Sequence, residues 1–177
     1  QKGLVLAGHD ISAGGMITAL LEMCFANVEG GLEVNLDKLS EQDIVKILFA
    51  ENPGILVQVK DKKAFEKLME DAGVGFAIIA KPTSERHILV SKEGVQYHFG
   101  IDYMRDVWYE SSYKLDIKQS GSVCVGNRFE NYKMQPLEFK YPKSFTGKLS
   151  SYGLTADRKG KSGIRAAVIR EKGCQCE

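Results

Sequence analysis

The chain has 177 residues, a length that fits one ordinary domain, or one domain plus a tail, and that allows a sizeable hydrophobic core. Its 44% hydrophobic and 27% charged residues are typical of soluble globular proteins, and its formal net charge of +1 argues against a nucleic-acid-binding surface or an acidic tail. No apolar run approaches the roughly 18 residues of a membrane span, and the first residues show no signal-peptide pattern. The missing initiator Met suggests a piece of a longer protein.

The segment HDISAGG, residues 9–15, stands directly before an apolar helical pattern. A carboxylate, a hydroxyl and two glycines in this position favour a phosphate site, because a helix N-terminus attracts anions and glycine allows close backbone approach. Asp10 is the candidate ligand for a hard cation such as Mg²⁺. The structural alternative is that Ser12 or Asp10 caps the helix and the glycines only form the turn.

After this motif, the spacing of apolar residues predicts helices and strands that alternate along the chain. Residues 16–28 predict a mostly buried helix, and residues 32–36 predict a half-exposed strand. Ser40 and Asp43 resemble a capping box that opens a second helix. Residues 55–59 are a predicted strand, Asp61 a predicted cap for a third helix that Gly73 closes, and residues 74–80 a further strand, so that 55–80 form a predicted strand–helix–strand unit.

The next elements are a hairpin and a fourth helix. Residues 88–90 and 95–99 predict two strands joined through 92–94, and residues 102–118 predict a helix with an aromatic core or interface stripe, formed by Tyr103, Trp108 and Tyr109. The expected fold class is α/β (α+β), with a layered mixed β-sheet covered by helices. The expected organisation is a domain over residues 1–140, a linker over 141–163 and a short strand-bearing segment over 164–177.

Cysteine and histidine residues give no metal-binding pattern. The four cysteines lack zinc spacing, Cys24 is predicted to lie in the core, and reduced thiols indicate a cytoplasmic protein. His9 is a candidate general base, but a hydrogen bond that stabilises the turn is favoured because no nucleophile is evident. His87 and His98 are interpreted as structural residues with satisfied hydrogen bonds.

Three segments carry a resemblance to a known superfamily. HDISAGGMITALLEMCFANV (9–28) resembles the opening helix of the second conserved domain in the aminoimidazole-ribonucleotide-synthetase-like superfamily, and FAENPGILVQVKD (49–61) is also similar to it. IRAAVIREKGCQCE (164–177) resembles the first strand and turn of class I glutamine amidotransferase domains. This order of segments is similar to the long-form phosphoribosylformylglycinamidine synthase family, with residues 164–177 as the truncated start of the amidotransferase domain.

The resemblance implies roles for individual residues and ligands. Asp10 is expected to bind Mg²⁺ and Ser12 to contact ATP or ADP, while related sequences often have Asp where this chain has Ala13. No catalytic residue is expected within the chain. Cys174 is not the amidotransferase nucleophile, which in that family lies far downstream. Because the family repeats its two-domain synthase unit, this piece corresponds to the second copy, whose nucleotide site is expected to be auxiliary.

The implied activity is that of an ATP- and glutamine-dependent ligase, which converts formylglycinamide ribonucleotide to the amidine in purine biosynthesis. The chain is expected to be inactive alone and to require its synthase N-domain and amidotransferase domain, with no nucleic-acid or membrane partner. Alternatives are another superfamily synthetase, such as selenophosphate synthetase or a hydrogenase-maturation protein, or a non-catalytic interaction domain. Residues 164–177 are expected to be disordered without the neighbouring strands of their domain.

Overall fold

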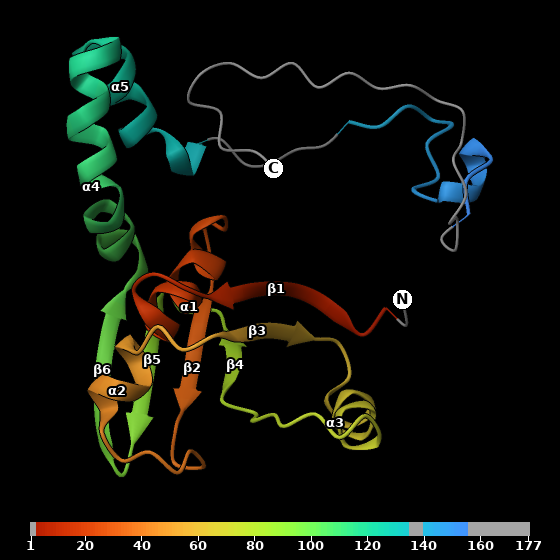
Figure 1. Ribbon diagram of the computed structural model, residues 1–177. Coiled ribbons are helices and arrows are strands. Elements are labelled where there is room, and N and C mark those ends of the chain that lie inside the picture. The colour runs from red at the N-terminus through yellow and green to blue at the C-terminus, as the bar shows by residue number, and fades with distance from the viewer. Residues whose placement is uncertain (1–2, 135–139, 156–177) are drawn as a thin grey trace. The chain divides into compact units, whose positions relative to one another are not determined.

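A computed structural model describes residues 3–134 and 140–155 (Figure 1), and the chain divides into two units, Gln1–Leu137 and Glu138–Glu177, whose described parts are treated separately. The described part of the first unit contains β1 (Val5–Ile11), α1 (Gly15–Phe25), β2 (Gly31–Asn35), α2 (Ile44–Phe49), β3 (Gly54–Val59), α3 (Lys62–Asp71), β4 (Ala80–Thr83), β5 (His87–Lys92), β6 (Val95–Gly100), α4 (Ile101–Ser120), α5 (Ser122–Glu130) and the 3₁₀ helix η1 (Tyr132–Met134). The described part of the second unit contains the 3₁₀ helix η2 (Leu149–Tyr152).

The strands of the first unit form two separate sheets. β1 and β3 pair antiparallel as a two-stranded sheet, and the other four strands form a sheet in the order β4-β2-β5-β6. Within the larger sheet β2 and β5 run parallel, whereas the β2–β4 and β5–β6 pairs are antiparallel. This mixture of parallel and antiparallel pairs, with helices packed on it, confirms the predicted α/β (α+β) class.

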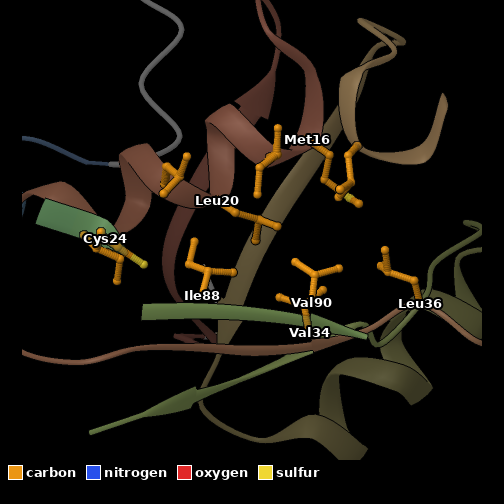
Figure 2. Packing of buried hydrophobic residues seen from close by; sticks show 11 residues of the cluster. Met16, Leu20, Cys24, Val34, Leu36, Ile88 and Val90 are labelled. Atoms are coloured by element: carbon orange, nitrogen blue, oxygen red, sulfur yellow. The ribbon is translucent and has the colours of Figure 1, made fainter. Parts of the chain in front are cut away.

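Helix α1 packs against the larger sheet and forms the centre of the core (Figure 2). The helix is apolar on nearly every side, which is the pattern of a buried helix, as predicted. It ends at Phe25, three residues before the predicted end. Burial raises the pKa of the Cys24 thiol, which agrees with its expected place in the core. The buried core side chains that come from α1, the sheet and its neighbours include Met16, Ile17, Leu20, Leu21, Val34, Leu36, Leu48, Ile88, Val90 and Ile101.

The predicted hairpin and the predicted third helix are confirmed. β5 and β6 are joined through Glu93 and Gly94, whose φ values of 50° and 80° match a two-residue turn that suits twisted strands. Asp61 caps α3 by accepting a hydrogen bond from the Ala64 amide at 3.0 Å. Gly73, with φ of 65°, ends the helix in the left-handed conformation.

The predicted strand–helix–strand unit over residues 55–80 is wrong. Residues 74–79 form no regular strand, and pairing begins where the Asn35 amide donates to the Ile79 carbonyl at 2.7 Å. β3 pairs with β1, whereas β4 pairs with β2 in the other sheet. An apolar run indicates that a segment is buried or forms a strand, but it does not indicate which other strand pairs with it. The sequence pattern therefore could not show that β3 and β4 belong to different sheets.

Two further details of the helices differ from expectation. Ser40 does not cap α2, because the Asp43 carboxylate accepts the Val45 amide at 2.9 Å and the helix starts at Ile44. α5 was not expected, and it follows α4 directly after Gly121, whose φ is 80°. The ring of Phe129 on α5 lies 4.6 Å from that of Tyr113 on α4, so aromatic packing joins the two helices.

The aromatic residues predicted to form a core or interface stripe on α4 lie mostly at the surface, and their place in an interface stays a prediction. Tyr103 is 69% exposed and Trp108 51%, so neither is a core residue. Trp108 and Tyr109 do pack as a stacked pair with ring centroids 6.2 Å apart.

None of the helices in residues 3–134 and 140–155 is both long and apolar enough to cross a membrane. The expected disorder of residues 164–177 concerns a segment that lies outside the described residues, and the domain boundaries stay a prediction.

Arg86 connects three parts of the first unit. Its Nε donates to Asp102 at the start of α4 at 3.1 Å, and its Nη1 donates to the carbonyls of Cys24 and Gly30 at 3.0 and 3.4 Å. The carbonyl of Cys24 lies at the C-terminal end of α1, where a cation also interacts favourably with the helix dipole. Only 18% of the Arg86 side chain is exposed, so its loss leaves polar groups that water reaches poorly.

We expect Arg86→Leu to lower the free energy of unfolding by about 2–4 kcal/mol, because a partly buried ion pair and two carbonyl contacts are lost together. Urea unfolding followed by circular dichroism measures this change. Lys81→Leu is the matched control: Lys81 pairs with Glu33 at 2.6 Å, but its side chain is 70% exposed, and its loss should cost less than about 1 kcal/mol. Equal effects of the two substitutions would contradict the role given to Arg86.

Asp37 fixes the end of β2 to the β5–β6 turn. Its carboxylate accepts the Glu93 amide at 2.7 Å and the Asn35 side-chain amide at 3.0 Å. The Glu93 hydrogen bond, followed by that from Asn35, lowers the pKa of Asp37 from its usual value of 3.8. A carboxyl with a lowered pKa in the folded state stabilises the fold above its unfolded pKa, and this contribution is lost as the pH falls through the folded pKa.

Asp37→Ala is therefore expected to make the decrease in unfolding free energy from about pH 5 to pH 2 smaller. One carboxylate that acid would protonate is already absent in this variant. Urea midpoints measured across this range test the expectation. Ser84→Ala, at an exposed residue that does not titrate, serves as the control and should keep the acid dependence of the unaltered chain. An Asp37 variant with that same dependence would show that its hydrogen bonds do not stabilise the fold.

Candidate functional site

The turn between β1 and α1 places the predicted ligands at the surface. β1 ends at Ile11 and α1 begins at Gly15, and the Gly15 amide closes the turn by donating to the Ser12 carbonyl at 3.0 Å. The Asp10 side chain is 75% exposed, and Ser12 is also exposed. Asp10, near the end of β1, and Ser12, in the turn, are thus both accessible close to the start of a buried helix.

The two glycines allow the turn to pack closely. Gly14 and Gly15 have φ values of 81° and 75°, in the left-handed region that favours glycine. A Cβ on Gly15 would lie 2.6 Å from the Leu48 carbonyl oxygen and 2.7 Å from Phe49 Cα, both in the backbone of α2. The start of α1 therefore touches the end of α2 at a point where only hydrogen fits.

Neither Asp10 nor Ser12 caps α1. The N-cap residue is Gly14, and no side chain makes a capping hydrogen bond to this helix. The capping alternative is wrong because the left-handed glycines delay the helix start, so that Ser12 contributes its carbonyl to the turn and leaves its hydroxyl outside the helix. The side chains of the motif are thus available for another role.

Glu51 is a residue of this turn that the sequence did not reveal. Its Oε1 accepts the Gly14 amide at 2.9 Å, although the two residues are 37 positions apart. A carboxylate at a helix N-terminus is favoured by the helix dipole. The Gly14 amide therefore already has a hydrogen-bond partner within the protein. The segment 49–61 already pointed to the same superfamily, but no local pattern in it indicated which side chain reaches α1.

The His9 ring contacts residues of both β1 and α1 near the end of β1. Its Nδ1 lies 2.7 Å from the Asp10 carbonyl and its Nε2 lies 3.1 Å from Glu22 Oε2. Trp108 Nε1 in turn donates to Glu22 Oε1 at 2.8 Å, which links β1, α1 and α4. With both ring nitrogens engaged, His9 has the geometry of the hydrogen-bonding interpretation and not that of a free general base. A cavity of about 500 Å³ lies beside this chain of contacts, against Phe25 and Arg105.

The donor set at the turn suits a hard cation that keeps water or phosphate oxygens. Within residues 3–134 and 140–155, no group of three or more His, Cys, Asp and Glu side chains is arranged to hold a metal ion. Near the turn, the Asp10 carboxylate is exposed, whereas the Glu51 carboxylate accepts the Gly14 amide. Mg²⁺ commonly binds through one or two carboxylates together with phosphate oxygens and waters, so a single exposed carboxylate at Asp10 fits Mg²⁺ bound to a nucleotide better than an all-protein metal site.

Comparison with known proteins identifies the family to which the chain belongs. Residues 1–92 match the family of AIR synthase related proteins, C-terminal domain, and the chain belongs to this family. Two curated relatives are phosphoribosylformylglycinamidine synthases: that of Homo sapiens is 30% identical over 182 residues, and the probable enzyme of Arabidopsis thaliana is 32% identical over 178 residues. The matches cover 96% and 97% of this chain but only 13% and 12% of the relatives, so the chain spans a small part of their length.

A solved structure agrees with this assignment at the level of the fold. T. maritima PurL complexed with FGAR matches 58% of this chain and 18% of its own, with a TM-score of 0.50 and 22% sequence identity. The family match and the curated relatives confirm the resemblance found in residues 9–28 and 49–61.

The close contact at Gly15 gives a prediction for stability. Gly15→Ala should lower the free energy of unfolding by about 2–4 kcal/mol, because a Cβ there clashes with the backbone of α2 and disfavours the left-handed conformation. Thermal and urea unfolding measure the change. Gly75→Ala is the control, since a Cβ on Gly75 would meet nothing within 4 Å, and it should change stability by less than about 1 kcal/mol. A Gly15 variant as stable as the control would refute the contact with α2.

Proposed function

We propose that this chain is one domain of a phosphoribosylformylglycinamidine synthase and that its β1–α1 turn forms part of a Mg²⁺–nucleotide site. The observation that carries the proposal is the joint exposure of Asp10 and Ser12 on a glycine turn that neither residue caps, in a chain of the AIR-synthase-related family. In the proposed parent reaction, ATP activates the amide oxygen of formylglycinamide ribonucleotide, and ammonia from glutamine is the nucleophile that gives the amidine.

Each side chain of the turn has a distinct proposed role. The Asp10 carboxylate would bind Mg²⁺ and so offset the negative charge of the phosphates, while the Ser12 hydroxyl would donate a hydrogen bond to a phosphate oxygen. Glu51 competes with a phosphate for the Gly14 amide, because the carboxylate accepts that N–H at 2.9 Å. Removing the charge of Glu51 should therefore favour phosphate at this amide.

The proposed partners are other domains of the same polypeptide, namely the synthase N-domain and the glutamine amidotransferase domain. Support comes from the small share of the curated relatives that the chain covers, 12–13%. The two-stranded β1–β3 sheet also exposes apolar side chains that a neighbouring domain would cover, with exposures of 58% for Leu6 and 76% for Ile55. In this proposal the chain alone is inactive, its nucleotide site is auxiliary, and the protein is cytoplasmic.

A second candidate is a domain that keeps the fold without binding a nucleotide. The specific observation in its favour is Glu51, whose carboxylate occupies the amide that a phosphate would use. A selenophosphate synthetase or a hydrogenase-maturation protein is less well supported, because the curated relatives reported above are phosphoribosylformylglycinamidine synthases. Nucleotide binding by the complete protein separates the first two candidates.

Mg·ADP binding to the complete protein that contains this chain, measured by isothermal titration calorimetry, tests the proposed site. Asp10→Asn and Ser12→Ala should each weaken binding by about 10-fold or more, because a metal ligand or a charge-assisted hydrogen bond is lost. Glu51→Gln should strengthen binding. Asp71→Asn on α3 is the matched control and should bind as the unaltered protein does.

Unchanged Mg·ADP binding in both the Asp10 and the Ser12 variants would refute the phosphate role of the turn. No binding by the unaltered protein would favour the non-catalytic candidate. Weaker binding in the Glu51→Gln variant would show that Glu51 binds the metal and does not compete with the phosphate.

A further inference from the structure

Two histidines face each other on the β5–β6 hairpin, on elements that take no part in the β1–α1 turn. The ring centroids of His87 and His98 are 5.6 Å apart, with an angle of 43° between the ring planes. We propose that His87 and His98 together chelate one divalent transition-metal ion of the class that prefers imidazole ligands, such as Ni²⁺, Cu²⁺ or Zn²⁺. This site does not depend on the proposed nucleotide site, which uses oxygen ligands and a hard cation.

The strand register creates the pair. His98 on β6 lies opposite Leu89 on β5, and His87 lies opposite Gly100, so the two histidines are diagonal neighbours on the same face of the sheet. Gly100 has no side chain, and a Cβ at that position would meet nothing within 4 Å. The space opposite His87 is therefore open, and the imidazole ring can lie toward His98.

The opposite face of β5 holds this register in place. Ile88 and Val90 alternate with His87 along the strand and are fully buried in the core. A shift of the strand by one residue would expose both side chains, and the Glu93–Gly94 turn fixes the pairing with β6 as well. The two imidazole rings are thus presented by a rigid hairpin, which lowers the entropy cost of chelation.

The distance between the rings fits a shared metal ion. Imidazole nitrogens bind Zn²⁺ at about 2.0–2.1 Å, which places the centroids of two coordinating rings roughly 5–6 Å apart. The observed 5.6 Å lies within that interval. The centroid distance between the two rings is therefore compatible with one ion shared by both imidazoles.

The ring nitrogens are also available. Among the described residues, no hydrogen bond or ion pair engages either ring, in contrast to His9, whose two nitrogens both have partners. The expectation of a structural role for His87 and His98 stays a prediction. His98 is exposed and His87 is half-buried, so an ion reaches the pair from solvent.

The remaining ligands of the ion would be water. The carboxylate of Glu33, on the neighbouring strand β2 and opposite Leu89, is already paired with Lys81 at 2.6 Å. Two imidazoles and several waters make an open site of modest affinity. The pair should bind more tightly than a single surface histidine, because the second imidazole binds at a high effective concentration.

Nuclear magnetic resonance of the histidine side chains tests the proposal. The chain has 3 histidines, so each ring gives its own Cε1–Hε1 signal, and His9 is an internal reference. With the accessible cysteines alkylated, substoichiometric Ni²⁺ should broaden the signals of His87 and His98 together and before that of His9. Mg²⁺ at the same concentrations should leave all three signals unchanged.

Single substitutions provide the decisive comparison. His87→Gln should raise the Ni²⁺ concentration needed to broaden the His98 signal by about 10-fold or more, and His98→Gln should do the same for His87. Backbone amide spectra of both variants should match the unaltered chain, which shows that the fold is kept. Independent broadening of the two rings, or a His98 signal that is equally sensitive in the His87 variant, would overturn the proposal.

Discussion

The packing of α1 against the four-stranded sheet is the constraint on which the rest of the structure depends. The helix contributes most of its circumference to the core, so its first residue must enter the fold at a fixed point. At that point Gly15 touches the backbone of α2, and Gly14 adopts a conformation that favours glycine. The accessible turn with Asp10 and Ser12 is thus a direct result of where a buried helix has to begin.

Contacts from distant parts of the chain hold this turn on two sides. Glu51, just beyond α2, accepts the Gly14 amide, while Glu22, which accepts a hydrogen bond from Trp108, contacts His9 on β1. At the other end of α1, Arg86 binds the Cys24 carbonyl and pairs with α4. The same helix therefore supports the candidate site at one end and anchors the long helix α4 at the other.

The sequence predicted what is local and missed what depends on pairing. The buried helix after residue 15, the cap at Asp61 and the Glu93–Gly94 turn follow from patterns within a few residues, and the structure confirms them. The two-sheet topology and the contact between Glu51 and Gly14 join residues far apart in the chain, and no periodicity reports such partners. The sequence indicated that Asp10 and Ser12 lie close to the same turn, but it did not indicate that Glu51 contacts this turn.

The strand that carries Asp10 belongs to the small β1–β3 sheet and not to the sheet of the core. A pair of strands has little stability of its own in water, and this pair exposes apolar side chains. In the proposed multidomain protein, a domain that covers β1 and β3 would order the strand leading into the turn. Covering this sheet and occupying the turn would then be thermodynamically linked, so that each event strengthens the other by the same factor.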